Sequence, residues 1–172
     1  MTIRLATLND IPQILALVAD VIPIMKTAGN FQWDYDYPNK QVFTDDINLN
    51  QLWVADITGA IAGVAAITTD QDAEYAQAGL NPDETAIVTH RLAVNINYQG
   101  RGVAAALLKQ AEQEAIGRGI EILRIDTNIA NQATQKLFPK LGYVLAGEIS
   151  LDLRPGLRFL CYEKRLNNNL NQ

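Results

Sequence analysis

The stretch from residue 85 to residue 119 restricts the fold more than any other part of the chain. It opens with an apolar segment from Thr85 to Val94 that has the pattern of a strand, turns through Gly100 and Gly102, and continues into a long helix. The helix is predicted by apolar residues that share one face, namely Val103, Leu107, Leu108, Ala111 and Ala115. A strand that leads through a glycine turn into a helix needs a sheet for that helix to cover, so this stretch favours an α/β domain.

The remaining segments complete the predicted sheet. Further strands are predicted at 2–7, 51–56, 60–69, 121–127, 143–153 and 157–166, and further helices at 11–22, 39–48 and 131–141. Thr58-Gly59 joins two of these strands as an antiparallel hairpin, whereas the turn-rich stretch 27–40 is predicted to be a loop and 70–83 a connection. This order predicts a mixed α/β sheet with helices on both faces. We expect one domain over 1–166 and a frayed tail at 167–172.

Composition limits the classes of protein that this chain can belong to. A chain of 172 residues with 48% hydrophobic and 19% charged residues can bury the core of one domain. The single cysteine, Cys161, and the single histidine, His90, exclude an intramolecular disulfide and a structural zinc site of clustered Cys and His. The net charge of −5 argues against nucleic acid as a partner. No apolar run approaches the ~20 residues of a membrane span, so we expect a cytoplasmic protein with no membrane partner and no metal.

The glycine turn has the chemistry of an anion site. The first N–H groups of a helix lack partners, the helix dipole favours negative charge, and glycine lets a phosphate approach the backbone. A P-loop is excluded because no Lys followed by Ser or Thr comes after Gly102, where the chain has Val103-Ala104-Ala105. A dinucleotide fingerprint matches loosely through Gly100, Gly102 and Ala105, but it belongs in a first βαβ unit, and here a hairpin precedes it. An isolated glycine pair could equally form a simple tight turn.

Four segments resemble the GNAT superfamily of N-acetyltransferases, and the resemblance extends over nearly the whole chain. They are Gln99-x-x-Gly102-x-Ala104, which resembles the family's Arg/Gln-x-x-Gly-x-Gly/Ala signature, the strand Leu92-Ala93-Val94, the helix at 131–143, and Arg4-x-Ala6 with Asp10. The resemblance implies a GNAT-like, mostly antiparallel twisted sheet of about seven strands. It also implies that an acetyl group passes directly from acetyl-CoA to a primary amine of a small molecule or peptide.

By the same resemblance, the residues that would contact acetyl-CoA surround the glycine turn. The backbone amides of Arg101 to Ala104 would hold the pyrophosphate, and the main chain of Leu92 and Val94 would pair with pantetheine, which Asn131 would also reach. The Leu92 amide would polarise the thioester carbonyl, an effect worth ~3–4 kcal/mol for one good donor. The full predicted set is Leu92, Ala93, Val94, Gln99, Gly100, Arg101, Gly102, Val103, Ala104, Asn131 and Phe138.

An ammonium acceptor must lose a proton before it attacks the thioester, so a base is expected nearby. The candidates are Glu84, His90 and Asp126. Each also has a simpler interpretation, because Glu84 could only begin a strand, His90 could only be hydrogen-bonded, and Asp126 could brace the following loop. Sequence reasoning leaves all three open.

The loop after the first helix is where the family builds its acceptor pocket. Phe31, Trp33 and Tyr35 are therefore the predicted acceptor-binding residues, followed by Tyr37. Asp34 and Asp36 lie between these aromatic residues, and carboxylates beside aromatic faces suit a cationic or amphipathic amine. The alternative is a surface loop that its aromatic residues attach to the core.

Position 138 departs from the family pattern. Many members have a tyrosine there that protonates the departing thiolate, which Phe138 cannot do. Pro139 disfavours helical geometry at the preceding residue, so the helix could bend or end there. Tyr143 and Tyr162 are candidate substitutes for the missing acid, and the alternative is that each is simply a packing residue of a strand. Because Phe138 replaces the usual tyrosine, a second hypothesis is a sensor that binds acyl-CoA without catalysis. A nicotinamide-dependent enzyme, which the loose dinucleotide fingerprint suggests, is a third hypothesis. The acceptor, the acyl chain and the oligomeric state, including a homodimer, also stay open.

Overall fold

Seven strands and four α-helices make up most of the molecule. The structure is a computed structural model and describes residues 1–166, so the predicted tail at 167–172 lies outside the described residues. The strands are β1 (Thr2–Leu5), β2 (Leu52–Ile57), β3 (Ala60–Thr68), β4 (Ile87–Val94), β5 (Ile122–Asn128), β6 (Val144–Ser150) and β7 (Arg158–Arg165). The helices are α1 (Ile11–Thr27), α2 (Lys40–Asn48), α3 (Val103–Gly117) and α4 (Gln132–Lys140), with short 3-10 helices η1 (Leu8–Asp10), η2 (Ala73–Ala78) and η3 (Ile96–Tyr98).

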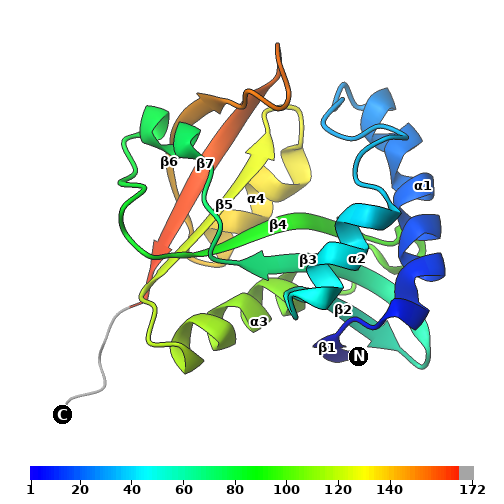
Figure 1. The fold of residues 1–172 in the computed structure, drawn as a ribbon. Coiled ribbons are helices and arrows are strands. Elements are labelled where there is room, and N and C mark those ends of the chain that lie inside the picture. The colour runs from blue at the N-terminus through cyan, green and yellow to red at the C-terminus, as the bar shows by residue number, and fades with distance from the viewer. Residues whose placement is uncertain (167–172) are drawn as a thin grey trace.

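All seven strands belong to one sheet, in the order β1-β2-β3-β4-β5-β7-β6 (Figure 1). Every neighbouring pair is antiparallel except β4 and β5, which are parallel. The predicted mixed, mostly antiparallel sheet is therefore confirmed. The predicted hairpin is confirmed too, because Thr58 and Gly59 both have positive φ, as a two-residue turn between β2 and β3 requires.

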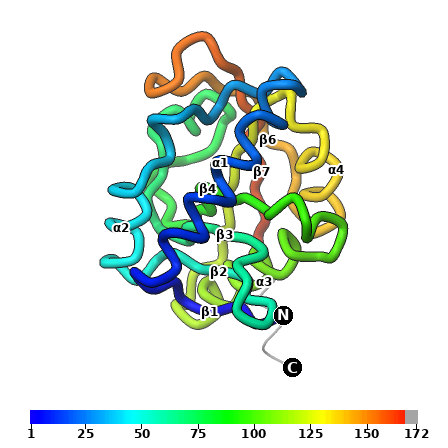
Figure 2. The backbone as a smooth tube through the Cα atoms, turned by 90° about the vertical axis from the view of Figure 1, so that its right-hand side faces the viewer, coloured from blue at the N-terminus to red at the C-terminus, as the bar shows by residue number. Residues whose placement is uncertain are grey.

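The helices cover both faces of the sheet, as predicted. Figure 2 shows α2 and α4 on opposite sides of the strands. One face packs against α1 and α2, whose core includes Ile14, Leu17 and Phe43 together with Val54 and Val64 of the sheet. On the other face, α3 and α4 pack against strands β3, β4, β5 and β7.

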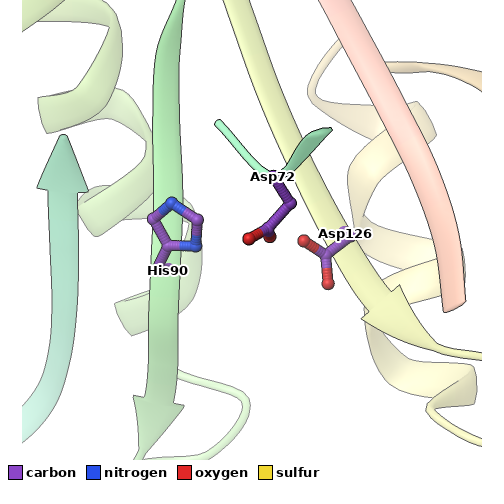
Figure 3. A group of neighbouring side chains, drawn as sticks. All are labelled: Asp72, His90 and Asp126. Carbon is purple, nitrogen blue, oxygen red and sulfur yellow. The ribbon is translucent and has the colours of Figure 1, made fainter. Parts of the chain in front are cut away.

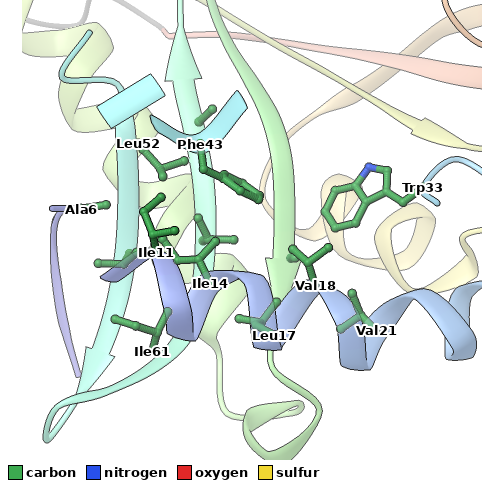
Figure 4. Packing of buried hydrophobic residues seen from close by; sticks show 14 of the residues in the cluster. Ala6, Ile11, Ile14, Leu17, Val18, Val21, Trp33, Phe43, Leu52 and Ile61 are labelled. Carbon is green, nitrogen blue, oxygen red and sulfur yellow. The ribbon is translucent and has the colours of Figure 1, made fainter. Parts of the chain in front are cut away.

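Helix α1 is the main component of the first core. Its apolar side chains recur at helical spacing, and Ile14, Leu17 and Val18 point into the cluster beneath Phe43 (Figure 4). Burying each such side chain contributes about 1.5–3 kcal/mol. The stretch Leu8–Thr27 also has the length and apolar composition of a membrane span, with a mean hydropathy of 1.5, which the sequence analysis did not anticipate. Figure 4 shows side chains of this helix packed in the core, which accounts for part of that composition, because 39% of the apolar window is buried.

Helix α3 lies unusually close to the sheet because of Gly63 on β3. A Cβ atom at that position would lie 2.5 Å from Cγ1 of Val103 and 3.1 Å from the carbonyl oxygen of Ala93. Real Cβ atoms do not approach other atoms so closely, so glycine is required here for the start of α3 to rest on β3. This contact determines where the glycine turn before α3 lies relative to β4.

Some local predictions need correction. The buried residues of α2 are Phe43 and Asp46, and Ile47, which is partly buried, packs against the same core. The connection at 70–83 contains the 3-10 helix η2, with a fully buried Tyr75. Helix α4 continues through Pro139 for one further residue before it ends.

Candidate functional site

Strands β4 and β5 separate after a short parallel contact. They pair only from Ile87 to Thr89, and beyond that point the two strands diverge (Figure 1). On its other side β4 stays paired with β3, but Arg91 and Leu92 together face the single residue Ala65, which makes a β-bulge. Arg91 has φ 54° at the bulge. Bulges bend the strand that carries them, so this one turns the end of β4 away from β5.

The strained backbone at Arg91 is held in place by its side chain. Its Nε and Nη2 donate to the carboxylate of Asp46 at 2.7 and 2.8 Å, and Nη1 donates to the hydroxyl of Tyr37 at 3.2 Å. A left-handed backbone at a non-glycine residue costs of order 1–3 kcal/mol and persists where surrounding contacts impose it. Sequence reasoning missed this residue, because its partners come from α2 and from a loop distant in sequence.

The opening between the two strands is part of a cavity of about 1480 Å³. One end is lined by the last residues of β4, the glycine turn, the start of α3 and the start of α4. The other end is lined by the loop between α1 and α2, the segment between β3 and β4, and the loop between β6 and β7. The cavity thus joins the predicted acetyl-CoA residues to the region predicted for the acceptor.

The glycine turn presents free N–H groups to the first end of the cavity. Gly100 and Gly102 have φ values of 74° and 77°, which favour glycine, and a Cβ at either would meet no atom within 4 Å. The N–H of Ala106 is the first to bond back, to the Gly102 carbonyl at 2.9 Å. Among the described residues, the N–H groups of Val103 to Ala105 have no backbone acceptor. This arrangement fits a phosphate group.

The free edge of β4 continues from this anion site. Ala93 and Val94 are paired with β3 on one side, and among residues 1–166 they pair with no strand on the other. An extended ligand with amide groups could add to that edge as a further strand. All predicted acetyl-CoA residues except one line the cavity, namely Leu92, Ala93, Val94, Gln99, Gly100, Gly102, Val103, Ala104, Asn131 and Phe138.

Arg101 is the exception. Its exposed side chain lies over the Tyr98 ring at 5.2 Å and does not line the cavity, so only its backbone amide is left for the predicted role. Asn131 caps α4 as predicted, since its side-chain oxygen accepts from the N–H of Thr134 at 3.3 Å. Contact of Asn131 with a ligand stays a prediction.

A cluster of three titratable side chains lies where β4 and β5 separate. The ligand atoms of Asp72, His90 and Asp126 lie within 4.8 Å of one another, with Asp72 between the other two side chains (Figure 3). His90 is on β4 and Asp126 on β5, while Asp72 precedes η2. Three ligands fall short of the four of a structural zinc site, and we assign no metal to this cluster. Sequence reasoning missed Asp72, although carboxylates at 70, 72 and 74 were a visible signal.

Hydrogen bonds around the cluster indicate which of its atoms carry protons. The Tyr75 hydroxyl donates to Asp126 at 2.6 Å, and His90 Nε2 lies 2.9 Å from the Asp70 carbonyl oxygen. A carbonyl oxygen only accepts, so Nε2 carries the proton and Nδ1 the lone pair of the neutral ring. Burial raises the pKa of both Asp72 and Asp126 above the ordinary range. Groups with perturbed pKa values in a cavity are typical of proton-transfer sites.

Glu84, the third predicted base, is not brought to the cavity. Its carboxylate bonds to Arg165 at 2.9 and 3.0 Å and to Arg124 at 2.8 Å. The hydrogen bonds from Arg165 and Arg124 hold the pKa of Glu84 below its usual value. Arg124 has no exposed side-chain surface, and it also pairs with Glu163. Glu84 therefore has a structural role, because a buried guanidinium needs its counter-ions.

Of the three aromatic residues predicted to bind the acceptor, one lines the cavity. Trp33 is 4% exposed and lines the cavity, together with Tyr37. Phe31 and Tyr35 are 56% and 76% exposed and do not line it, so these two predictions are corrected. The reason is a turn in which Asp34 accepts from the N–H groups of Asp36 and Tyr37, both at 2.9 Å. This turn brings Tyr37 inward and leaves Tyr35 in solvent.

Phe138 lines the cavity and packs between two tyrosines. Its ring centroid lies 5.2 Å from that of Tyr162 and 5.9 Å from that of Tyr143. Neither tyrosine lines the cavity, and the Tyr143 hydroxyl is buried without a partner among the described residues. Both tyrosines therefore act in packing here, and neither replaces the missing acid.

Comparison with known proteins agrees with the geometry of the site. The model of the acetyltransferase (GNAT) family matches residues 21–143. An acetyltransferase of the GNAT family from Streptococcus agalactiae is 30% identical, with a TM-score of 0.78 over 97% of this chain and 96% of that one. A Salmonella typhimurium protein, solved with its cofactor acetyl-CoA, has a TM-score of 0.72 over 100% of this chain and 97% of that one. At 17% identity that likeness shows the fold alone.

One curated relative has a more specific name. N-acetylaspartate synthetase from Xenopus tropicalis is 25% identical over 112 residues, which are 65% of this chain and 37% of that protein. The chain thus spans little more than a third of the length of this relative, and the similarity leaves the rest of that protein unmatched.

Proposed function

Because the chain belongs to the acetyltransferase (GNAT) family, we propose that it transfers the acetyl group of acetyl-CoA directly to a primary amine of a small molecule or peptide. The observation that carries this proposal is the cavity between β4 and β5. It has free helical N–H groups at one end and the cluster of Asp72, His90 and Asp126 at the other. An anion site and a proton-accepting site, joined by an open strand edge, are what a direct transfer between a CoA thioester and an amine requires.

Acetyl-CoA is a substrate here, and the residues present fit its parts. The pyrophosphate fits the N–H groups of Val103 to Ala105, where two glycines leave the backbone accessible. Pantetheine fits the unpaired edge of β4. The N–H of Leu92, at the bulge, is then the donor for the thioester carbonyl oxygen, where negative charge develops.

The cluster at the far end supplies the base. In the proposed reaction, the ammonium of the acceptor gives a proton to the group formed by Asp72, His90 and Asp126. The nitrogen lone pair then attacks the carbonyl carbon, a C–N bond forms, and the C–S bond breaks with its electron pair on sulfur. The nitrogen loses its second proton to the same cluster or to water. Since Phe138 has no proton to give, water protonates the thiolate.

The test measures thiol release from acetyl-CoA over a panel of amines. We expect turnover by the natural chain and a loss of about 10²-fold in Asp126→Asn, with unchanged affinity for CoA, because a positioned base contributes ~10²–10⁴-fold. Glu84→Gln is the matched control, since its amide oxygen can still accept from Arg124, and its rate should stay within about twofold at a temperature where it is folded. A protein that binds acetyl-CoA but releases no thiol with any amine is a sensor, and that result would overturn the proposal.

A further inference from the structure

The acceptor end of the cavity carries an excess of negative charge. Four carboxylates line it, namely Asp70, Asp72, Glu74 and Asp126. Within residues 1–166, none of them forms an ion pair with a lysine or an arginine. Three of the four, Asp70, Asp72 and Glu74, are spaced two residues apart in the stretch that follows β3 and enters the first turn of η2. The fourth, on β5, lies deepest in the site.

The two arginines that line the same region are paired with other carboxylates. The guanidinium of Arg91 is held by both carboxylate oxygens of Asp46, a residue that does not line the cavity. Arg154 donates to Asp34 at 3.2 Å and lies over the ring of Tyr37 at 4.8 Å. Each arginine thus already has its own counter-ion, and neither forms an ion pair with the four carboxylates of the cavity.

A second observation indicates that the site is built for a polar guest. The hydroxyl of Thr89, a residue that is 3% exposed, is buried without a hydrogen-bond partner among the described residues, and Thr89 lines this cavity. Buried hydroxyls in folded proteins nearly always have partners, so an unpartnered one beside a cavity is a position where a ligand can bond. Val21, Met25 and Trp33 line the same end, which gives an apolar wall for a hydrocarbon chain.

If the chain is the transferase proposed above, the charges at this end of the cavity identify its acceptor class, and we propose that the acceptor is an aliphatic diamine or a longer polyamine. One amine would lie beside Asp72 and Asp126, where it is deprotonated and acetylated. A second amine would stay charged and bind Asp70 and Glu74, which are nearer to solvent. The methylene chain between them lies along the apolar wall.

The electrostatics of the site support this assignment. Burial raises the pKa of both Asp72 and Asp126, and the charge of a cationic guest beside them would oppose that rise. An acceptor that carries carboxylates finds no unpaired arginine at this end of the cavity. The charges therefore disfavour aspartate, the amino acid in the name of the curated relatives, as the acceptor of this chain.

The first experiment compares four acceptors in the thiol-release assay. Three of them, 1,4-diaminobutane, 1-aminobutane and 4-aminobutanoate, share one reacting amine and differ at the far end of the chain. L-aspartate is the fourth. We expect kcat/KM for the diamine to exceed that for 1-aminobutane by up to about tenfold, and both to exceed the two carboxylates, because the second ammonium adds an attraction to two carboxylates that solvent reduces but does not abolish. Turnover in which 1-aminobutane equals the diamine, or in which a carboxylate acceptor is preferred, would overturn the inference while the proposed function stands.

A pair of variants locates the second ammonium site. In D70N/E74Q we expect the preference for 1,4-diaminobutane over 1-aminobutane to fall to about threefold or less, since both outer charges are removed. Asp83→Asn is the matched control, because Asp83 is an exposed carboxylate of the same connection between β3 and β4 that does not line the cavity, and it should leave the preference unchanged. An unchanged preference in D70N/E74Q would overturn the assignment of that site.

Thermal unfolding separates the failure of this inference from the failure of the proposed function. The protein is melted alone and with saturating CoA, in each case with 1,4-diaminobutane or 4-aminobutanoate. Stabilisation by the diamine alone, without turnover of any amine, would overturn the transferase proposal but support the diamine site. No turnover and no selective stabilisation would overturn both.

Discussion

Replacing Gly63 by alanine tests whether close packing of α3 on β3 positions the anion site. The new Cβ would lie 2.5 Å from a methyl group of Val103 and 3.1 Å from the carbonyl oxygen of Ala93. Valine has one strongly preferred rotamer in a helix, so the methyl group cannot simply rotate away. Relief requires a shift of the start of α3, and such overpacking costs typically ~1–3 kcal/mol. For a chain of this size that lowers the melting temperature by about 2–12 °C.

The same shift moves the N–H groups of Val103 to Ala105, which the proposed function assigns to pyrophosphate. We therefore expect Gly63→Ala to weaken CoA binding by about tenfold, measured by calorimetry on the folded variant. Gly117→Ala is the matched control, because Gly117 is in the same helix and a Cβ there meets no atom within 4 Å. It should stabilise the protein by about 0.5–1 kcal/mol and leave CoA affinity unchanged. If Gly63→Ala keeps both its stability and its CoA affinity, the close contact does not position the helix.

Three further predictions concern single side chains. Asn131→Ala should lower the free energy of unfolding by ~1 kcal/mol, because the helix cap is lost. We also expect weaker CoA binding in calorimetry, as a contact between Asn131 and the ligand requires, whereas unchanged affinity would mean that Asn131 only caps the helix. Phe138→Tyr should raise the rate of thiol release by about tenfold or less, because the natural chain already works with water as the acid, and turnover that appears only in this variant would favour the sensor. The bond from Arg4 lowers the pKa of Asp10 from 3.8 to about 2, so the carboxylate contributes about 2 kcal/mol that is present above pH 4 and lost as pH falls through 2. Acid unfolding of Asp10→Asn should lack this dependence, and an identical pH profile in both proteins would refute it.

The elements that could be predicted from sequence are those whose causes are local. The hairpin at Thr58-Gly59, the apolar face of α3 and the cap at Asn131 each depend on residues within a few positions. The glycine turn belongs to the same class, since a positive φ at Gly100 is a property of one residue and its neighbours.

The features that could not be predicted depend on partners far apart in the chain. Glu84 was a plausible base until the fold placed it against Arg124, which is 40 residues away. Asp72 gained its importance only because the fold brings it between β4 and β5. Tyr35 and Phe31 were plausible because aromatic residues commonly line pockets, but both are exposed, and a turn at Asp34 leaves Tyr35 in solvent.

The short contact between β4 and β5 leaves few backbone hydrogen bonds between two parts of the sheet. Strands β1 to β4 form one half of the sheet and β5 to β7 the other, and within the described part of the chain three residue pairs, from Ile87 to Thr89, join the two halves as a strand pair. A ligand bound at the unpaired edge of β4 would add contacts across the seam between β4 and β5. Ligand binding would then make the sheet more rigid, because such contacts lower the population of states in which the two halves move apart. We expect slower amide hydrogen exchange at the seam when CoA is bound, and a looser molecule each time the product leaves.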